Sequence, residues 1–278
     1  MNKNVQNLDP STVESFGDEW SKYDQHGLSQ KEGQHIFEEY FSIFPWDKLP
    51  SNAQGFDMGC GSGRWAKFVA PKVAKLNCID PSKAIEVAKK NLTQFENINY
   101  IQASVASPQL AKNSQDFGYS LGVLHHIPNT ENGIKSCVDL LKPGAPFLIY
   151  LYYAFDNRPL LFKLIWKISD FFRRFICALP SLPKLFICKL IAMFIYFPLA
   201  KLSLVLEKLG LNVENIPLCY YRNHSFYTMS TDARDRFGTP LEKRFTKIQI
   251  EQMMKNSGLK NIKFSDHVPF WCAVGIKS

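Results

Sequence analysis

Three glycines at alternate positions, Gly59, Gly61 and Gly63, constrain the fold of this 278-residue chain more than any other feature. A short apolar run ends at Asp57 just before them, and helix-compatible residues resume at Arg64. This pattern predicts a strand, a tight turn and then a helix. Glycine lacks a Cβ atom, so its backbone can adopt positive φ and lie directly against a ligand, which the amide groups of the following helix also face. The turn is therefore predicted to bind a ligand.

A second acid ends the next predicted strand. Residues 75–79 form an apolar run that leads to Asp80, 23 residues after Asp57, and Pro81 and Ser82 then open another helix. An acid at the tip of a second strand can accept hydrogen bonds from both hydroxyls of a ribose. The third glycine comes one residue earlier than in the dinucleotide fingerprint G-x-G-x-x-G. The pattern thus combines an acid suited to a ribose with a glycine spacing that differs from the dinucleotide one.

The motif D-x-G-x-G-x-G, followed by a strand and Asp-Pro-Ser, resembles the class I S-adenosylmethionine-dependent methyltransferases. The resemblance implies S-adenosyl-L-methionine as the cofactor. It also implies an α/β Rossmann-like fold, with a seven-stranded, mostly parallel sheet, helices on both faces and a helical insertion after strand five. The implied cofactor-binding residues of these two loops are Asp57, Gly59, Cys60, Gly61, Gly63, Asp80, Pro81 and Ser82. A glycine turn that binds nothing is the alternative.

Strands and helices alternate from residue 53 to residue 153. Alternation of this kind predicts a parallel sheet with helices on both faces, whose ligands bind at the carboxyl ends of the strands. The first predicted strand ends at residue 57, and the others cover 75–80, 98–102, 117–124 and 145–153. The first predicted helix begins at residue 64, and the others cover 82–92 and 130–141.

Residues 116–127, DFGYSLGVLHHI, resemble the fourth-strand motif of the quinone- and small-molecule branch of the same family, although Gln115 replaces the usual Phe. The resemblance implies that the backbone of Leu121, Gly122 and Val123 lines the methionine end of the cofactor. It likewise implies an adenine contact after the third strand, at Ala103 and Ser104. Many relatives have Ala-Asp at those two positions, so the serine hydroxyl replaces a carboxylate there.

His125 and His126 come directly after this strand, at the predicted ligand cleft. Histidine is the commonest general base near neutral pH, although a lone histidine is more often a structural hydrogen-bonding group. We therefore predict a catalytic or positioning role for one of the two. Tyr152, just past the fifth strand, is the second candidate base, and Tyr153 beside it is a candidate acceptor-binding residue.

The first 52 residues are predicted to form a helical lid. Residues 1–15 are polar and resemble a solvated tail, and a helix is expected over 29–44. Phe16, Trp20 and Tyr23 lie between them. The resemblance implies that Trp20 covers the cofactor, because an F-G-x-x-W element precedes the loop in many small-molecule methyltransferases. Core anchoring of an N-terminal helix is the alternative.

Residues 157–210 interrupt the alternation and mix Leu, Ile and Phe with Lys and Arg, which predicts one or two amphipathic helices. The longest uncharged run, residues 190–200, has 11 residues and contains Pro198, whereas a bilayer requires roughly 20. This argues against a transmembrane helix. Two readings remain open: a helical cap packed on the sheet, or a basic amphipathic surface lying on an anionic membrane.

Residues 215–245 crowd aromatic and basic side chains into a segment with little periodicity, so an irregular loop is expected there. Loops of this composition often recognise ligands, and arginine offers a planar fork for carboxylate or phosphate. The candidate substrate-binding residues, which would suit an anionic or polyhydroxylated acceptor, are Tyr153, Arg222, His224, Tyr227 and Arg236. A plain surface loop is the alternative.

The chain ends with a predicted helix opened by a capping box at Thr246 and Gln249, and with strands over 261–265 and 271–276. The resemblance implies that the last strand inserts antiparallel. The predicted domains are an N-terminal helical lid at 1–52, a cofactor-binding core at 53–156, a helical insertion with the acceptor loop at 157–245, and a C-terminal helix and strands at 246–278.

Composition limits the partners and the compartment. The formal net charge of +8 permits anionic partners, including nucleic acid and membrane surfaces. The seven cysteines include no C-x-x-C pair and lie mostly in apolar runs, which indicates reduced thiols in a cytoplasmic protein with no metal site. No secretory signal opens the sequence given.

These observations predict a methyltransferase for a small-molecule acceptor such as a sugar, a lipid or another biosynthetic intermediate, with peripheral membrane contact through 157–210 as one reading. Nucleic-acid methylation is the second hypothesis, but neither N-P-P-Y nor D-P-P-Y follows the fourth strand. A cofactor-binding module without catalysis is the third.

Overall fold

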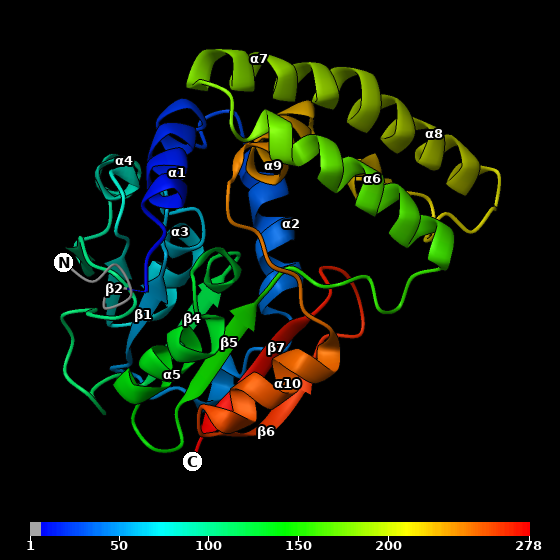
Figure 1. The fold of residues 1–278 in the computed structure, drawn as a ribbon. Helices are drawn as coiled ribbons and strands as arrows, with labels where there is room; N and C mark the ends of the chain where they lie inside the picture. Colours follow the sequence, from blue (N-terminus) through cyan, green and yellow to red (C-terminus); the bar gives the residue numbers. More distant parts are fainter. Residues whose placement is uncertain (1–6) are drawn as a thin grey trace. The chain divides into compact units, whose positions relative to one another are not determined.

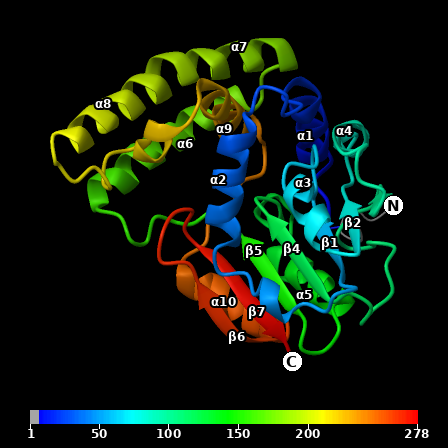
Figure 2. The same cartoon turned by 180° about the vertical axis from the view of Figure 1, so that it is seen from behind.

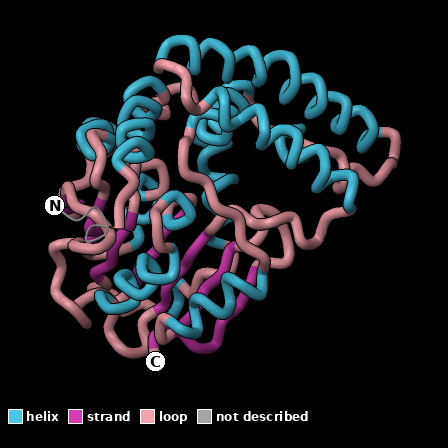
Figure 3. The backbone as a smooth tube through the Cα atoms, in the orientation of Figure 1, coloured by secondary structure: helices cyan, strands magenta, loops and turns pink. Residues whose placement is uncertain are grey.

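The computed structural model describes residues 7–278. Contacts divide the chain into two compact units. The sheet unit contains the residues up to Gln25 together with 33–154 and 241–278, and the helical unit contains 26–32 and 155–240. Figure 3 shows the seven strands of the described chain, all of which belong to the sheet unit.

The sheet has the strand order β3-β2-β1-β4-β5-β7-β6. The first five strands in this order pair in parallel, and β7 inserts antiparallel between β5 and β6. This confirms the predicted mostly parallel sheet and its antiparallel last strand. The strands are β1 Gln54–Met58, β2 Lys75–Ile79, β3 Ile98–Ile101, β4 Phe117–Leu121, β5 Pro146–Tyr150, β6 Leu259–Phe264 and β7 Cys272–Lys277.

Helices cover both faces of this sheet (Figures 1 and 2). The helices α5 and α10 pack on one face, and α2, α3 and α4 on the other. The elements are α1 Pro10–Lys22, α2 Gln30–Phe41, η1 Trp46–Lys48, α3 Ala66–Val69, η2 Ala70–Lys72, α4 Ala84–Asn91, η3 Leu124–His126, α5 Thr130–Leu140 and α10 Lys247–Asn256.

Alternation along the strands explains the two cores. In β5, Phe147 and Ile149 enter the core under α5 and α10, whereas Leu148 between them enters the core under α2, α3 and α4. Successive strand side chains point to opposite faces, so a strand covered on both sides needs a continuous apolar run. The sequence FLI supplies that run. The chain order turns back between β1 and β4, which places the switch point of the sheet at the carboxyl ends of these two strands.

Two sequence-based expectations are wrong at the ends of elements. Residues 10–15 are helical, because the Asp9 carboxylate caps α1 by accepting hydrogen bonds from Ser11 N and Thr12 N, and Pro10 suits the first turn. The rest of the expected tail, residues 1–6, lies outside the described residues. The fourth strand ends at Leu121 and not at residue 124, because Gly122 has a φ of +77°. The predicted capping box at Thr246 and Gln249 is confirmed.

The helical unit contains α6 Leu160–Ile176, α7 Ser181–Ile191, the π-helical turn η4 Ala192–Tyr196, α8 Phe197–Lys208, η5 Cys219–Asn223 and α9 Phe226–Gly238. Met229, Ala233 and Phe237 of α9 form the core of this unit with residues of α7, η4 and α8, namely Cys188, Ala192, Tyr196 and Ala200. Their spacing of four places them on one face of a helix. The expectation of an irregular loop over 215–245 is therefore wrong for residues 226–238, which form a helix. Ser225 caps the N-terminus of this helix.

The segments α7, η4 and α8 form one continuous helix over 181–208, which we call the long helix. It has a mean hydropathy of 1.9 in its most apolar window and is long enough to cross a membrane by length and composition. The helix is longer than the uncharged run of residues 190–200, because the lysines on either side of that run do not interrupt it. Only 22% of that apolar window is buried.

The packing around Gly59 can be tested by substitution. A Cβ atom at Gly59 would lie 2.9 Å from Val123 Cβ, whereas Gly144 has the same φ of +82° with no atom of the described chain within 4 Å of its Cβ position. We expect Gly144→Ala to cost about 1 kcal/mol through backbone strain. Gly59→Ala should cost about 1–3 kcal/mol more, because overpacking adds to the strain.

Urea unfolding of the two variants measures this difference. The two substitutions share the same residue change and the same φ, so equal losses would contradict a packing role for Gly59.

Candidate functional site

The glycine loop lies at the carboxyl ends of β1 and β2, where its backbone is held by the neighbouring strand. Gly59 N and Cys60 N both donate to the carbonyl oxygen of Ile79, at 2.7 and 3.1 Å. Gly59, Gly61 and Gly63 all have positive φ. A Cβ atom at Gly63 would come within 2.6 Å of Leu92 Cδ1, so this glycine allows α4 to approach the loop. The predicted strand, turn and helix are present.

Asp80 holds the loop together from the end of β2. Its Oδ2 accepts a hydrogen bond from Gly61 N at 2.9 Å, and its Oδ1 accepts from Ser82 N at 2.8 Å and from Ser82 Oγ at 2.6 Å. Burial raises the pKa of this carboxyl, and these hydrogen bonds to its ionised form oppose the shift. Pro81 lies in the same turn. Each carboxylate oxygen has lone pairs beyond these bonds, so Asp80 can accept further hydrogen bonds from a ligand.

Asp57 is buried next to Tyr119, its register partner on β4. Burial raises the pKa of the Asp57 carboxyl well above its usual range, the Tyr119 hydroxyl opposes this shift, and the charge of Asp80 adds to it. Two carboxyl groups in one buried site repel each other when both are ionised. The sequence analysis did not select Tyr119; a tyrosine inside an otherwise apolar strand was the available signal.

Trp20 of α1 lies against the glycine loop. A Cβ atom at Gly61 would be 3.1 Å from the indole Nε1 of Trp20, so the indole ring contacts the loop backbone. This is the loop at which Trp20 was predicted to cover the cofactor. Asn91 of α4 connects the same region, because its amide donates to the carbonyl oxygens of Asp24 and Ser62. The structure thus brings Trp20 and the loop together, and a lid function of residues 1–52 stays a prediction.

The end of β4 contributes a second stretch of bare backbone. Gly122 has a φ of +77°, and no atom of the described chain lies within 4 Å of its Cβ position. Leu121 is buried beneath it and Val123 packs over Gly59. On the other side of Asp80, Ala103 N donates to the Asp80 carbonyl oxygen at 3.2 Å, and Ser104 follows directly. The structure therefore gathers all the predicted cofactor-binding residues around the carboxyl ends of β1 to β4.

His125 and His126 lie in η3, next to Tyr152. The ring centroids of His125 and Tyr152 are 3.9 Å apart and stacked, and those of the two histidines are also 3.9 Å apart. His126 Nδ1 lies 2.6 Å from the carbonyl oxygen of Leu241, which can only accept, so Nδ1 carries the proton. Neutral His126 therefore presents Nε2 as a proton acceptor. The edge of Phe16 packs against this ring with the centroids 5.0 Å apart.

The other histidine has the opposite tautomer. Its Nδ1 accepts a hydrogen bond from Tyr152 N at 3.4 Å, so Nε2 of neutral His125 carries the proton. Burial, followed by the charges of His126 and Arg244, lowers the pKa of His125 well below its usual range. His125 is thus a neutral hydrogen-bond donor, and His126 is the better placed of the two to accept a proton.

A buried ion pair borders this cluster. Arg244 Nε donates to Glu242 Oε1 at 2.8 Å, and the guanidinium lies 4.9 Å from the centre of the Tyr152 ring. Arg244 Nη1 also donates to the carbonyl oxygen of Tyr153 at 3.3 Å. Neither Arg244 nor Glu242 is among the site residues predicted from the sequence. Their separation from Tyr152 by about ninety residues of chain hid the contact.

The remaining predicted acceptor residues belong to the helical unit and have partners within it. Arg222 makes a two-pronged ion pair with Glu207, at 2.8 and 2.9 Å. His224 Nδ1 lies 3.3 Å from Glu32 Oε1. A third residue, Arg236, lies 3.6 Å from Asp170. The Tyr227 ring covers Gly27. These contacts explain how the four side chains are positioned, and a role in acceptor binding stays a prediction.

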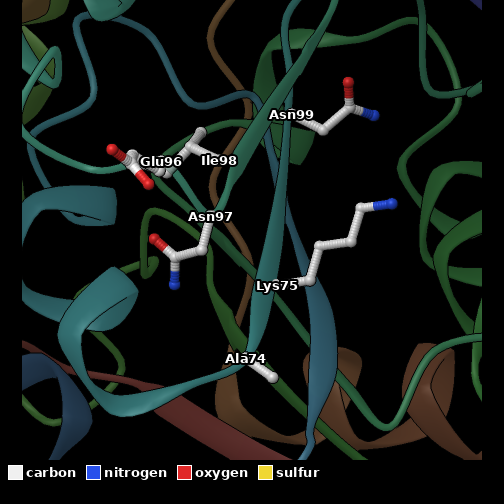
Figure 4. A pocket seen from close by; sticks show the side chains of 6 residues that line it. All are labelled: Ala74, Lys75, Glu96, Asn97, Ile98 and Asn99. Atoms are coloured by element: carbon white, nitrogen blue, oxygen red, sulfur yellow. The ribbon is translucent and has the colours of Figure 1, made fainter.

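A surface hollow at the opposite end of the sheet has no such chemistry (Figure 4). It is lined by Ala74, Lys75, Glu96, Asn97, Ile98 and Asn99 at the amino ends of β2 and β3. Asn97 donates to the carbonyl oxygens of Ala70 and Val73, and Asn99 donates to Asn77 Oδ1, so both amides serve the fold. The functional candidates therefore remain at the carboxyl ends of the strands.

Comparison with known proteins agrees with this geometry. The family described as "Methyltransferase domain" matches residues 56–149. A ubiquinone biosynthesis O-methyltransferase of Vibrio vulnificus is 31% identical over 166 residues, which are 55% of this chain and 66% of that protein. One of Coxiella burnetii is 33% identical over 106 residues, 37% of this chain and 43% of that protein. The chain thus spans less than two thirds of the length of these relatives.

Solved structures show the same fold. An S-adenosylmethionine-dependent methyltransferase of Thermotoga maritima has a TM-score of 0.52 at 12% identity and covers 96% of this chain and 100% of its own. The phosphoethanolamine N-methyltransferase 2 of Haemonchus contortus has a TM-score of 0.52 at 14% identity, covering 95% of this chain and 46% of its own. Together with the glycine loop, Asp80 and the sheet order, these structures show that the chain has the Rossmann-like fold of S-adenosylmethionine-dependent methyltransferases, and residues 56–149 match a methyltransferase domain.

Proposed function

We propose that this protein transfers a methyl group from S-adenosyl-L-methionine to a small-molecule acceptor. The observation that carries the proposal is the bare backbone of the glycine loop and of Gly122, with the Asp80 carboxylate between the loop and Ser82. The names of the relatives support the reaction: they are O-methyltransferases of ubiquinone biosynthesis, and the Haemonchus structure contains S-adenosylhomocysteine.

The residues present fit an adenosyl cofactor. Asp80 has acceptor capacity for two ribose hydroxyls, and Trp20 offers an aromatic surface beside Gly61. Ser104 lies next to the end of β3, where a hydroxyl can meet the adenine amino group. The open space at Gly122 adjoins the end of β4, which suits the methionine portion.

Bound S-adenosyl-L-methionine would supply an electrophilic methyl group on a sulfonium. This chain's residues then have to orient the acceptor and exclude water. Where the acceptor is a hydroxyl, His126 Nε2 accepts its proton, with Nδ1 held by the Leu241 carbonyl oxygen. His125 Nε2 donates a hydrogen bond to an acceptor oxygen, and Arg244 adds positive charge beside Tyr152.

Nucleic acid is the less favoured acceptor. Residues 160–208 contain eight of the basic side chains and two acidic ones, a net charge of +6 out of the +8 of the chain. In that segment the basic residues alternate with apolar ones, and nucleic-acid surfaces instead form continuous basic stripes.

The acceptor class can be identified with methyl-labelled cofactor and a fractionated extract. We expect label in a lipid or in an aqueous metabolite. Label found only in RNA would contradict the proposal, and cofactor binding without transfer to any fraction would indicate a module without catalysis.

Asp80 tests the cofactor site directly. We expect Asp80→Asn to weaken S-adenosyl-L-methionine binding by about 1–3 kcal/mol, because hydrogen bonds to a charged acceptor are lost. Isothermal titration calorimetry measures the change. Asp139→Asn, a carboxylate paired with Lys112 and Lys135 outside the site, is the matched control and should bind normally. Equal affinities for both variants would show that the ribose is held elsewhere.

Proton acceptance can be assigned to one histidine. For a hydroxyl acceptor, His126→Gln should lower kcat by about 100-fold or more and remove the acid limb of the pH–rate profile, because no group remains to take the proton. His125→Gln should raise KM, because a hydrogen bond to the acceptor is lost, and should leave the acid limb of the pH–rate profile in place. An unchanged pH profile in His126→Gln would rule out His126 as the base.

The buried neutral state of His125 predicts a dependence of stability on pH. Its pKa is lowered in the folded protein, so the unfolded chain binds more protons below pH 6.5, and stability is lost as the pH falls from 6.5 towards the folded pKa. The loss should approach 1.4 kcal/mol per pH unit. Urea unfolding should show a shallower dependence for His125→Gln and an unchanged one for His267→Gln, which alters an exposed histidine. Equal slopes in all three proteins would contradict this account.

A further inference from the structure

The amphipathic helix α6 is oriented with its apolar side outward. Asp170 and Arg173 point into the helical unit, where Arg173 Nε donates to Asp170 Oδ1 at 2.7 Å and Arg173 Nη1 donates to the Thr239 carbonyl oxygen at 2.8 Å. Arg173 is only 6% exposed, whereas Leu160 is 83% and Phe175 62% exposed. A helix in contact with water on its outer side has the reverse arrangement. The outer side of α6 therefore suits an apolar partner better than water.

The exposed apolar side chains of α6 form one continuous stripe. At 100° per residue they occupy an arc of about 140°. They are Leu160, Leu161, Leu164, Ile165, Ile168, Phe171, Phe172 and Phe175. Lys163, Lys167 and Arg174 follow one edge of this arc, within about 40° of one another. Basic residues along the edge of an apolar face are typical of helices that lie in the interface of an anionic bilayer.

The long helix has the same orientation. Its inward positions hold mostly small residues: Cys188, Ala192 and Ala200 are fully buried in the core formed with α9, which also contains Tyr196. Its outward positions hold large apolar residues, namely Leu182, Phe186, Met193, Phe194, Ile195, Phe197, Leu202 and Val205. Both α6 and α7 pack on α9 (Figure 1). We call the outward apolar residues of α6 and the long helix the apolar face.

The apolar face is confined to one part of the molecule. Of the twenty exposed large apolar side chains among residues 7–278, nineteen lie between Leu160 and Phe226, and the other is Ile248. Contiguous exposed apolar surface of this extent marks an interaction site. The net charge of +6 on residues 160–208 defines the partner as anionic as well as apolar.

We propose that the apolar face inserts into the surface of an anionic phospholipid bilayer, with α6 and the long helix lying in the plane of the interface. The apolar side chains enter the acyl region, and Lys163, Lys167 and Arg174 meet the phosphate groups. An anionic surface attracts each such basic residue, so this electrostatic attraction adds to the free energy gained by burying the apolar side chains. The inference concerns the helical unit alone and does not depend on the methyl acceptor.

A membrane-spanning orientation fits the long helix less well. Its inward side is already occupied by α9, and Lys184 on that side lies 3.4 Å from the Gly238 carbonyl oxygen. A spanning helix would have to leave these contacts. A second copy of the chain fits less well too, because a two-fold contact would bring two surfaces of the same positive charge together.

Vesicle flotation of the full chain tests the proposal. We expect binding to phosphatidylglycerol-containing vesicles and much weaker binding to pure phosphatidylcholine. Lys163→Gln/Lys167→Gln/Arg174→Gln should lower the partition coefficient for the anionic vesicles roughly 100-fold. Leu164→Glu/Phe171→Glu should abolish binding. Ile248→Glu is the control, because it also replaces an exposed apolar residue by glutamate but lies outside the apolar face, and it should bind normally.

Two further measurements separate the alternatives. Circular dichroism of each variant checks that the helices are retained. Extraction at alkaline pH should release the bound protein, because an interfacial helix does not cross the bilayer.

Several results would overturn the proposal. These are failure of the unmodified chain to float with anionic vesicles, equal flotation of the Leu164→Glu/Phe171→Glu variant, and resistance to alkaline extraction, which would indicate a spanning helix. A lipid-independent dimer that the same two substitutions convert to a monomer would show that the apolar face binds a second copy.

Discussion

The candidate site depends on the hydrogen bonds that the Asp80 carboxylate accepts from Gly61 N, Ser82 N and Ser82 Oγ. Asp80 connects the glycine loop to the end of β2, and through Ala103 N its backbone connects to the end of β3. A carboxylate buried at this position is costly unless it is hydrogen-bonded. The loop supplies those bonds, so the same carboxylate organises the turn and keeps lone pairs that can accept further hydrogen bonds.

The two units of the chain use their apolar residues in opposite ways. In the sheet unit, apolar strands are covered on both faces by helices, which leaves Ile248 as its one exposed large apolar side chain among the described residues. In α6 of the helical unit, the polar side chains of Arg173 and Asp170 are inside, and Phe171, Phe172 and Phe175 are outside. Water alone would not stabilise the second arrangement, because burial of apolar surface is the main favourable term in folding. The exposed apolar residues of the helical unit therefore call for a partner, which we propose is an anionic bilayer.

The paired histidines show how the backbone assigns chemical roles. The two residues are identical in type and adjacent in sequence, yet His126 Nδ1 donates to a carbonyl oxygen and His125 Nδ1 accepts from an amide. The tautomer of each ring follows from its partner, so one presents a lone pair and the other a proton. Sequence reasoning selected both residues and could not separate them, because Leu241 is remote in the chain and the Tyr152 amide direction depends on the path of the chain after β5.

The sequence by itself determined the parallel core, the glycine loop and the acid that follows β2, because alternating apolar runs, glycine spacing and capping residues act over a few neighbouring positions. It also determined that residues 157–210 are helical. Only the tertiary structure decided which side of α6 faces outward, that Arg244 and Glu242 pair beside Tyr152, and that residues 226–238 form a helix with a buried face. Those features depend on contacts between segments far apart in the chain, which residue patterns within one segment do not specify.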